Sequence, residues 1–274
     1  MSPHSPQKKS TPRPGLQTAK PFLLGPLVRA VLFDVDGTLY HQKPLQSLMA
    51  MELAGLPLAS RSLQKARRTW KAIGAFRKVR EKLRERGASE DPLEDLQFHV
   101  SQERTGEEKS ELEAIVSEWI YQRPLKYLKL CRRAGLEGLL SFLKERAVLA
   151  GALSDYPVAE KLQALGVSSS FSIRLCTTDP DINAFKPHPR GFLRACELWG
   201  IPPEEVLYVG DRADVDAKGA AASGMRCAIL TGLGLAGMGS RRFHRQSSVD
   251  YLSVSSLSQL RHRLTEVVGP LPRR

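Results

Sequence analysis

A short apolar stretch that ends in two carboxylates constrains this chain more than any other feature. Residues 31–33 predict a strand buried on both faces, and Asp34 and Asp36 follow directly. Because the two acids are two residues apart, their side chains point the same way on an extended chain, and Gly37 then permits a sharp turn. Paired carboxylates at the end of a buried strand suit a hard cation and acid–base chemistry. The alternative interpretation is a strand followed by a solvated turn.

From residue 136 onward the pattern alternates between helices and strands. Apolar runs predict strands at residues 147–153, 171–176, 205–209, 227–230 and, at the edge, 251–254. Helical patterns accompany them at residues 139–146, 158–165, 189–199, 217–222 and 255–264. Strands that alternate with helices indicate right-handed βαβ units, so this part predicts an α/β fold with a Rossmann-like parallel sheet.

The region between residues 41 and 133 has helical signals and no strand-like run. Apolar residues at spacings of three and four predict a long amphipathic helix, whose buried stripe is Leu63, Ala66, Trp70, Ile73, Phe76, Val79 and Leu83. Other helices are expected at residues 44–56, from Asp91 onward and at 107–120. The sequence therefore predicts an all-α domain at 41–133, inserted into a core formed by 28–40 and 134–268. Residues 1–27 are expected to be a disordered basic tail and 269–274 a short C-terminal tail.

Polar residues follow three of the predicted strands. Asp34 follows the first, Ser154 and Asp155 end the second, and Asp211 follows the strand at 205–209. In parallel sheets, ligands bind beyond the carboxyl ends of the strands. Three strands that end in reactive groups at one edge are much stronger evidence for a site than any one of them.

The composition is that of an ordinary globular chain with an excess of positive charge. Of the 274 residues 42% are hydrophobic, and the formal net charge is +12. No apolar run approaches the roughly 18–20 residues that span a membrane. The cysteines are scattered and suit buried free thiols, so a cytoplasmic protein is expected: they are Cys131, Cys176, Cys196 and Cys227. The charge permits an anionic partner but specifies none.

Charge is unevenly distributed within the helical region. Residues 61–90 are strongly basic, and residues 91–118 are strongly acidic. One interpretation is that these helices have solvated faces that pair with each other. The other is that the basic run, which includes Arg67, Arg68 and Lys71, attracts an anionic substrate or partner.

Four motifs together resemble those of the haloacid dehalogenase superfamily. They are residues 34–38, Ser154, Lys186–Pro187 and Gly210–Asp211 with Asp216, in the superfamily's order and at strand ends. The resemblance covers roughly residues 29–265, and the helical insert is similar to the superfamily's C1-type cap, as in phosphoglycolate phosphatase-like members. It implies a hydrolase with this cap over the edge of the sheet.

The resemblance and the chemistry of the acids imply a metal-assisted nucleophile. Asp34 can attack phosphorus and form an aspartyl-phosphate. Because a carboxylate and a phosphate repel each other, a cation is needed, and Mg²⁺ prefers oxygen ligands. Asp34 and Asp211 can supply side-chain oxygens, and by resemblance the backbone carbonyl of Asp36 supplies another. Asp216 would hold a metal-bound water or Lys186.

The remaining motif residues have roles in proton transfer and phosphate binding. The Asp36 side chain can protonate the leaving oxygen and later activate water. Ser154 can donate a hydrogen bond to the phosphoryl group, and Lys186 can offset its growing negative charge. Other substrate contacts are expected from Gly37, Thr38 and Asp155. His188 is taken as structural, and Arg212 stands where the superfamily commonly has a small hydroxyl residue.

The leading hypothesis is a Mg²⁺-dependent phosphatase that hydrolyses a small phosphomonoester through an aspartyl-phosphate. A phosphomutase of the same fold would use the same residues, whereas a dehalogenase needs neither an acid at Asp36 nor a metal. A non-catalytic protein could instead bind an anionic partner through the basic tail and cap. It would have no reason to combine Asp34, Asp36, Lys186 and Asp211. The expected partner is a small phosphorylated metabolite, with no membrane span and no nucleic acid.

Overall fold

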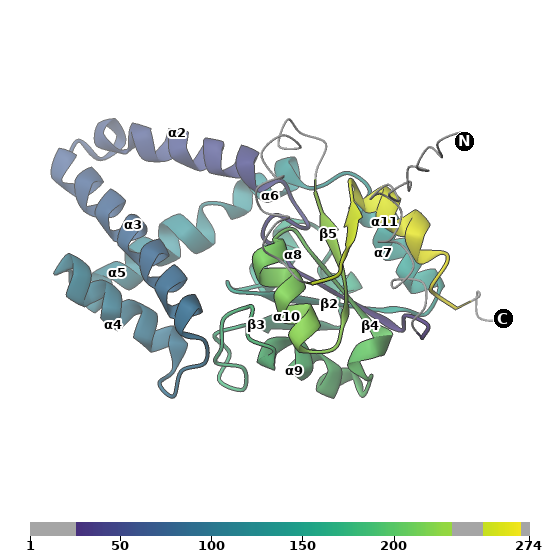
Figure 1. Cartoon of the computed structure of the whole chain (residues 1–274). Coiled ribbons are helices and arrows are strands. Elements are labelled where there is room, and N and C mark those ends of the chain that lie inside the picture. Colours follow the sequence, from purple (N-terminus) through teal and green to yellow (C-terminus); the bar gives the residue numbers. More distant parts are fainter. Residues whose placement is uncertain (1–25, 232–248, 270–274) are drawn as a thin grey trace, which may run out of the picture.

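Six parallel strands form the core of the molecule (Figure 1). The computed structural model describes residues 26–231 and 249–269. The strand order is β3-β2-β1-β4-β5-β6, and every neighbouring pair is parallel. The strands are β1 (Ala30–Phe33), β2 (Leu149–Ser154), β3 (Ile173–Cys176), β4 (Val206–Gly210), β5 (Arg226–Leu230) and β6 (Leu252–Val254). The predicted Rossmann-like α/β fold is confirmed, and β6 lies at the edge as expected.

Helices cover both faces of the sheet and bury two apolar clusters. Val31 and Phe33 of β1 face one cluster and Leu32 faces the other, since side chains alternate along a strand. The first face is covered by α7 (Leu136–Glu145), α8 (Ala159–Ala164) and α11 (Leu257–Leu264). The second is covered by α9 (Arg190–Trp199) and α10 (Lys218–Ala222). Because all of β1 and β4 is buried, the residues that follow these strands are held in fixed positions.

The proposed cap extends away from the sheet as a group of helices (Figure 1). They are α2 (Gln42–Ser60), α3 (Leu63–Arg86), α4 (Leu93–Thr105), α5 (Lys109–Val116), the π-helical segment η1 (Ser117–Gln122) and α6 (Leu125–Cys131). Small apolar clusters hold these helices together, one of them around Phe76 and Phe98. An isolated antiparallel bridge joins Tyr40 to Arg132, where the chain leaves the core and returns to it.

Five of the seven residues in the apolar stripe predicted for α3 are buried, and two are exposed. Ala66, Ile73, Phe76, Val79 and Leu83 are buried. Leu63 is 66% exposed and Trp70 is 42% exposed. Leu63 lies in the first turn of α3, and the Trp70 indole donates a hydrogen bond to the Leu53 carbonyl at the edge of the packed helices.

Two sequence predictions lie outside the described residues. They are the predicted basic tail up to residue 25 and the predicted C-terminal tail from residue 270. Within the described part, all four cysteines are buried and free, which confirms that prediction. In the same part, no helix is long and apolar enough to cross a membrane.

Candidate active site

Three neighbouring strands end beside one another and carry the predicted site. In the sheet, β1 lies between β2 and β4, and the register pairs Phe33 with Ala152 on one side and Val209 on the other. Asp34, Ser154 and Asp211 are consequently placed at the same edge, as the sequence predicted.

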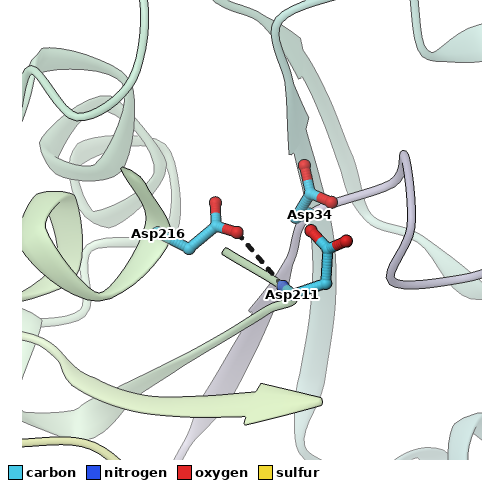
Figure 2. A group of neighbouring side chains, drawn as sticks. All are labelled: Asp34, Asp211 and Asp216. Atoms are coloured by element: carbon cyan, nitrogen blue, oxygen red, sulfur yellow. Dashed lines mark hydrogen bonds between the residues drawn. The ribbon is translucent and has the colours of Figure 1, made fainter. Parts of the chain in front are cut away.

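Asp34, Asp211 and Asp216 form a compact group of carboxylates (Figure 2). One oxygen of each lies within 4.8 Å of the others. Asp216 is supplied by the short π-helical segment η4 (Ala213–Ala217), and its Oδ2 accepts hydrogen bonds from the backbone N–H groups of Asp211 (3.1 Å) and Arg212 (3.0 Å). These bonds fix the loop after β4 so that the three carboxylates converge.

The three clustered carboxylates repel one another, and the charge of Lys186 offsets this only in part. Burial raises the pKa of Asp34 well above its usual range, and Asp216 and Asp211 add to this although Lys186 opposes it. Burial and the Asp216 charge raise the pKa of Asp211 to about 7. Asp34 Oδ2 is buried and has no hydrogen-bond partner among the described residues. An orphaned carboxylate oxygen within a cluster of acids fits a hard divalent cation.

Lys186 binds two of the three carboxylates. Its Nζ is 2.6 Å from Asp34 Oδ1 and 2.8 Å from Asp216 Oδ1, and it donates to the Tyr208 hydroxyl at 3.0 Å. Burial alone would lower the pKa of Lys186, but Asp216 and Asp34 outweigh it and hold that pKa well above its usual range. Lys186 is therefore a buried ammonium beside Asp34 Oδ1.

Asp36 is held apart from the three-carboxylate group. It accepts hydrogen bonds from the hydroxyls of Tyr40 and Ser154 (2.7 Å for Ser154) and lies 2.5 Å from Lys161 Nζ. Burial raises the pKa of Asp36, yet Lys161 and the hydrogen bonds outweigh it and lower that pKa below its usual value. Its side chain is not in the candidate metal group, so the predicted metal contact of Asp36 rests on its backbone carbonyl alone.

Ser154 at the end of β2 and Asp155 directly after it contact different groups. Ser154 donates to Asp36 and accepts from the backbone N–H of Tyr156 (3.1 Å). The Asp155 carboxylate accepts from Thr177, from the Lys186 backbone N–H (3.2 Å) and from Arg84 of the cap (2.7 Å). Asp155 is thus engaged within the protein and fixes the loop that carries Lys186.

Gly37 and Thr38 lie on the turn after β1. A Cβ on Gly37 would lie 2.1 Å from Asp211 Oδ2, and its φ of +97° also favours glycine. Thr38 is fully buried, and its Oγ1 has no hydrogen-bond partner among the described residues. The turn therefore lets the first and last motifs approach each other closely.

The two residues of uncertain role lie beside the site rather than in the carboxylate group. His188 Nδ1 accepts a backbone hydrogen bond from Arg190 at 3.3 Å. Arg212 pairs with Asp214 at 2.8 Å and approaches Glu81 of the cap at 3.9 Å.

Sequence reasoning missed three residues that contact the motif side chains. Tyr40 and Lys161 both bind Asp36, and Tyr208 binds Lys186 and Asp216. Each had a weak signal in the sequence. Tyr40 comes soon after the predicted turn at Gly37, Lys161 lies in the predicted helix at 158–165, and Tyr208 is a phenol within a buried strand that needs a hydrogen-bond partner. None lies in a motif, so only the fold brings them to the site.

Comparisons with known proteins agree with this geometry. The profile of the haloacid dehalogenase-like hydrolases matches residues 28–224. Glyceraldehyde 3-phosphate phosphatase of Methanopyrus kandleri is 29% identical over 210 residues, which is 73% of this chain and 82% of the relative. Phosphoglycolate phosphatase 1 of Pseudomonas aeruginosa is 28% identical over 220 residues, which is 79% of this chain and 74% of the relative.

Solved structures with the same fold include both dehalogenases and phosphatases. A 2-haloacid dehalogenase from Pseudomonas syringae superposes with a TM-score of 0.60 at 21% identity, covering 87% of this chain and 99% of the other. A HAD phosphatase from Thermococcus onnurineus gives 0.57 at 21% identity, covering 88% and 100%. These likenesses show the fold, and the match of the family profile decides membership. The chain belongs to the haloacid dehalogenase-like hydrolase family.

Proposed function

We propose that this hydrolase is a Mg²⁺-dependent phosphatase that cleaves a phosphomonoester through an aspartyl-phosphate on Asp34. The observation that carries the proposal is the division of the acids at the sheet edge. Asp34 lies with Asp211 and Asp216 and pairs with Lys186, whereas Asp36 has its own set of hydrogen-bond donors. A nucleophile and a proton donor are thereby kept separate within two residues of each other. The phosphatase names of the two relatives support the same reaction class.

The side chains available for a cation are those of Asp34 and Asp211, with the Asp36 carbonyl as a further oxygen. Asp216 holds Lys186 and orients the loop of Asp211. When bound, Mg²⁺ would neutralise the acids and the phosphate, so that attack by one anion on another is less opposed.

The residues of this chain can perform both half-reactions with atoms and protons balanced. In the first, an Asp34 oxygen attacks phosphorus, the bond from phosphorus to the ester oxygen breaks, and Asp36 gives a proton to that oxygen. This donor is the protonated form of Asp36, which is the minor form at neutral pH because its pKa is lowered. In the second, the Asp36 carboxylate takes a proton from water while the water oxygen bonds to phosphorus. The bond between phosphorus and Asp34 breaks, and phosphate leaves. Lys186 and Ser154 stabilise the negative charge on the phosphoryl oxygens.

The test is phosphate release from p-nitrophenyl phosphate and from small phosphomonoesters, including glyceraldehyde 3-phosphate and phosphoglycolate. Wild-type protein should be active with Mg²⁺ and inactive with EDTA. Asp34→Asn nearly preserves the shape of the side chain but removes the nucleophile, so activity should disappear. Asp214→Asn is the matched control, since Asp214 belongs to the same loop as Asp216 but its side chain is 54% exposed. Activity above a few per cent of wild type in Asp34→Asn would refute the assignment.

A further inference from the structure

A cavity of about 370 Å³ lies between the core and the cap helices. Its core wall includes Asp36, Tyr40, Tyr156 and Lys161, and its cap wall is formed by α2, α3, η1 and α6. In the proposed function, Asp36 protonates the oxygen that leaves phosphorus. The organic part of the ester must therefore extend from Asp36 into this cavity, and the inference below rests on that function.

The cap wall of the cavity is mainly apolar. It includes Leu45, Met49, Leu53, Ile73, Trp119 and Leu128. The volume is within the usual range of small-molecule sites, about 300–1,000 Å³, where apolar walls provide affinity and a few polar groups provide specificity. Such walls favour a leaving group with a hydrocarbon or aromatic body, because a short polar chain would leave them uncovered.

The charged side chains that line the cavity differ in whether they already have a partner. Lys161 pairs with Asp36 at 2.5 Å, and Glu81 pairs with Arg84 at 2.5 Å. The Arg77 guanidinium makes no hydrogen bond or ion pair with any residue in 26–231 or 249–269. The Arg77 guanidinium is therefore the charged group of the cavity lining that is available for an anion.

We propose that this cavity selects a monophosphate ester whose alcohol has an apolar body and an anionic group, with the anion bound by Arg77. The phosphate lies at Asp34, the ester oxygen lies beside Asp36, and the hydrocarbon lies against the α2 and η1 walls. Two independent interactions then determine which substrate is preferred: the burial of the apolar body and the ion pair with Arg77.

Three esters of primary alcohols separate these terms: phosphoglycolate, benzyl phosphate and 4-(phosphonooxymethyl)benzoate. Phosphoglycolate has the anion without the apolar body, benzyl phosphate has the body alone, and the third has both. We expect kcat/KM to be highest for the benzoate and to exceed that of phosphoglycolate by roughly tenfold or more.

Two variants, each with a control, test whether the cavity residues Arg77 and Met49 contact the substrate. Arg77→Met should lower kcat/KM for the benzoate by about tenfold more than for benzyl phosphate, since a hydrogen bond to a charged group is lost. Its control is Lys78→Met, the next exposed residue of α3, which does not line the cavity. Met49→Gln should lower the preference for benzyl phosphate over phosphoglycolate. Its control is Met51→Gln, on the same helix and 64% exposed.

The outcomes distinguish this inference from the proposed function. If p-nitrophenyl phosphate is hydrolysed and phosphoglycolate is preferred to both larger esters, the assignment of the cavity is wrong although the phosphatase stands. Equal losses for the benzoate and benzyl phosphate in Arg77→Met would remove Arg77 as the anion contact. If p-nitrophenyl phosphate is not hydrolysed in the presence of Mg²⁺, the proposed function is overturned, and this inference with it.

Discussion

Two carboxylates that are two residues apart have opposite surroundings. Burial and neighbouring acids raise the pKa of Asp34, whereas Lys161 and hydrogen bonds lower that of Asp36 despite its burial. When surroundings move two pKa values in opposite directions, the groups are suited to different tasks. In the proposed reaction, Asp34 needs a cation to become a carboxylate nucleophile, and Asp36 readily forms the carboxylate that activates water.

The raised pKa of Asp211 predicts that Mg²⁺ binding depends on pH. Without a cation its pKa is about 7, so below that pH a proton competes with the metal for this carboxylate. The raised pKa of Asp34 has the same effect, because a proton on Asp34 also competes with the metal. Mg²⁺ affinity should therefore rise from about pH 6 to pH 8, and protons should be released on binding. Calorimetric titrations in buffers of different ionisation enthalpy measure both quantities, and a Kd that does not change over this range would contradict the prediction.

At the scale of elements, the cap helix α3 is fastened to the loops that carry the site. Arg84 lies 2.7 Å from Asp155 Oδ2, and the other oxygen of Asp155 accepts the Lys186 backbone N–H. Arg80 is buried one turn earlier, with its guanidinium over the rings of Tyr156 (4.1 Å) and Phe185 (4.5 Å). The cap and the Lys186 loop are therefore parts of one packed interface.

Breaking this contact should destabilise the protein. In Arg84→Met the Asp155 carboxylate keeps its other hydrogen bonds and the nearby charges of Lys186 and Arg80 but loses its ion pair with Arg84. The loss should therefore lie below the roughly 3–5 kcal/mol of a fully uncompensated buried charge. The free energy of unfolding in urea at pH 7, where the lowered pKa of Asp155 keeps it ionised, measures the loss. Arg86→Met, in the same last turn but exposed, is the control. Equal stabilities of the two variants would show that Arg84 does not fasten the cap.

The sequence predicted the elements better than the contacts between them. Apolar runs located the strands, and the polar residues that follow them gave the site residues Asp34, Ser154 and Asp211. The partners Lys161 and Arg84 could not be predicted, because their contacts depend on how helices are oriented against the sheet. For the same reason, the period of α3 did not reveal that Trp70 lies where its neighbours no longer cover it.

For the whole molecule, the uneven charge of the cap is partly explained by pairing between helices. Arg68 forms ion pairs with Glu107 and Glu111, the latter at 2.5 Å, and Lys71 donates to the Thr105 carbonyl at 2.6 Å. Two of the three basic side chains expected to attract a substrate are thus engaged with the acidic part of the cap. Substrate selection is therefore better sought in the cavity between cap and core than on the outer basic surface.

In the proposed reaction, Asp34 becomes phosphorylated and Asp36 then activates water. Asp36→Asn removes the proton acceptor, while p-nitrophenolate is a leaving group that needs no proton. With p-nitrophenyl phosphate and Mg²⁺, this variant should release a burst of about one equivalent of p-nitrophenol and then turn over slowly. Peptide mass spectrometry after the burst is the deciding measurement. A phosphoryl group on Asp34 is the predicted result, and steady turnover with no burst and no modified Asp34 would contradict an aspartyl-phosphate mechanism.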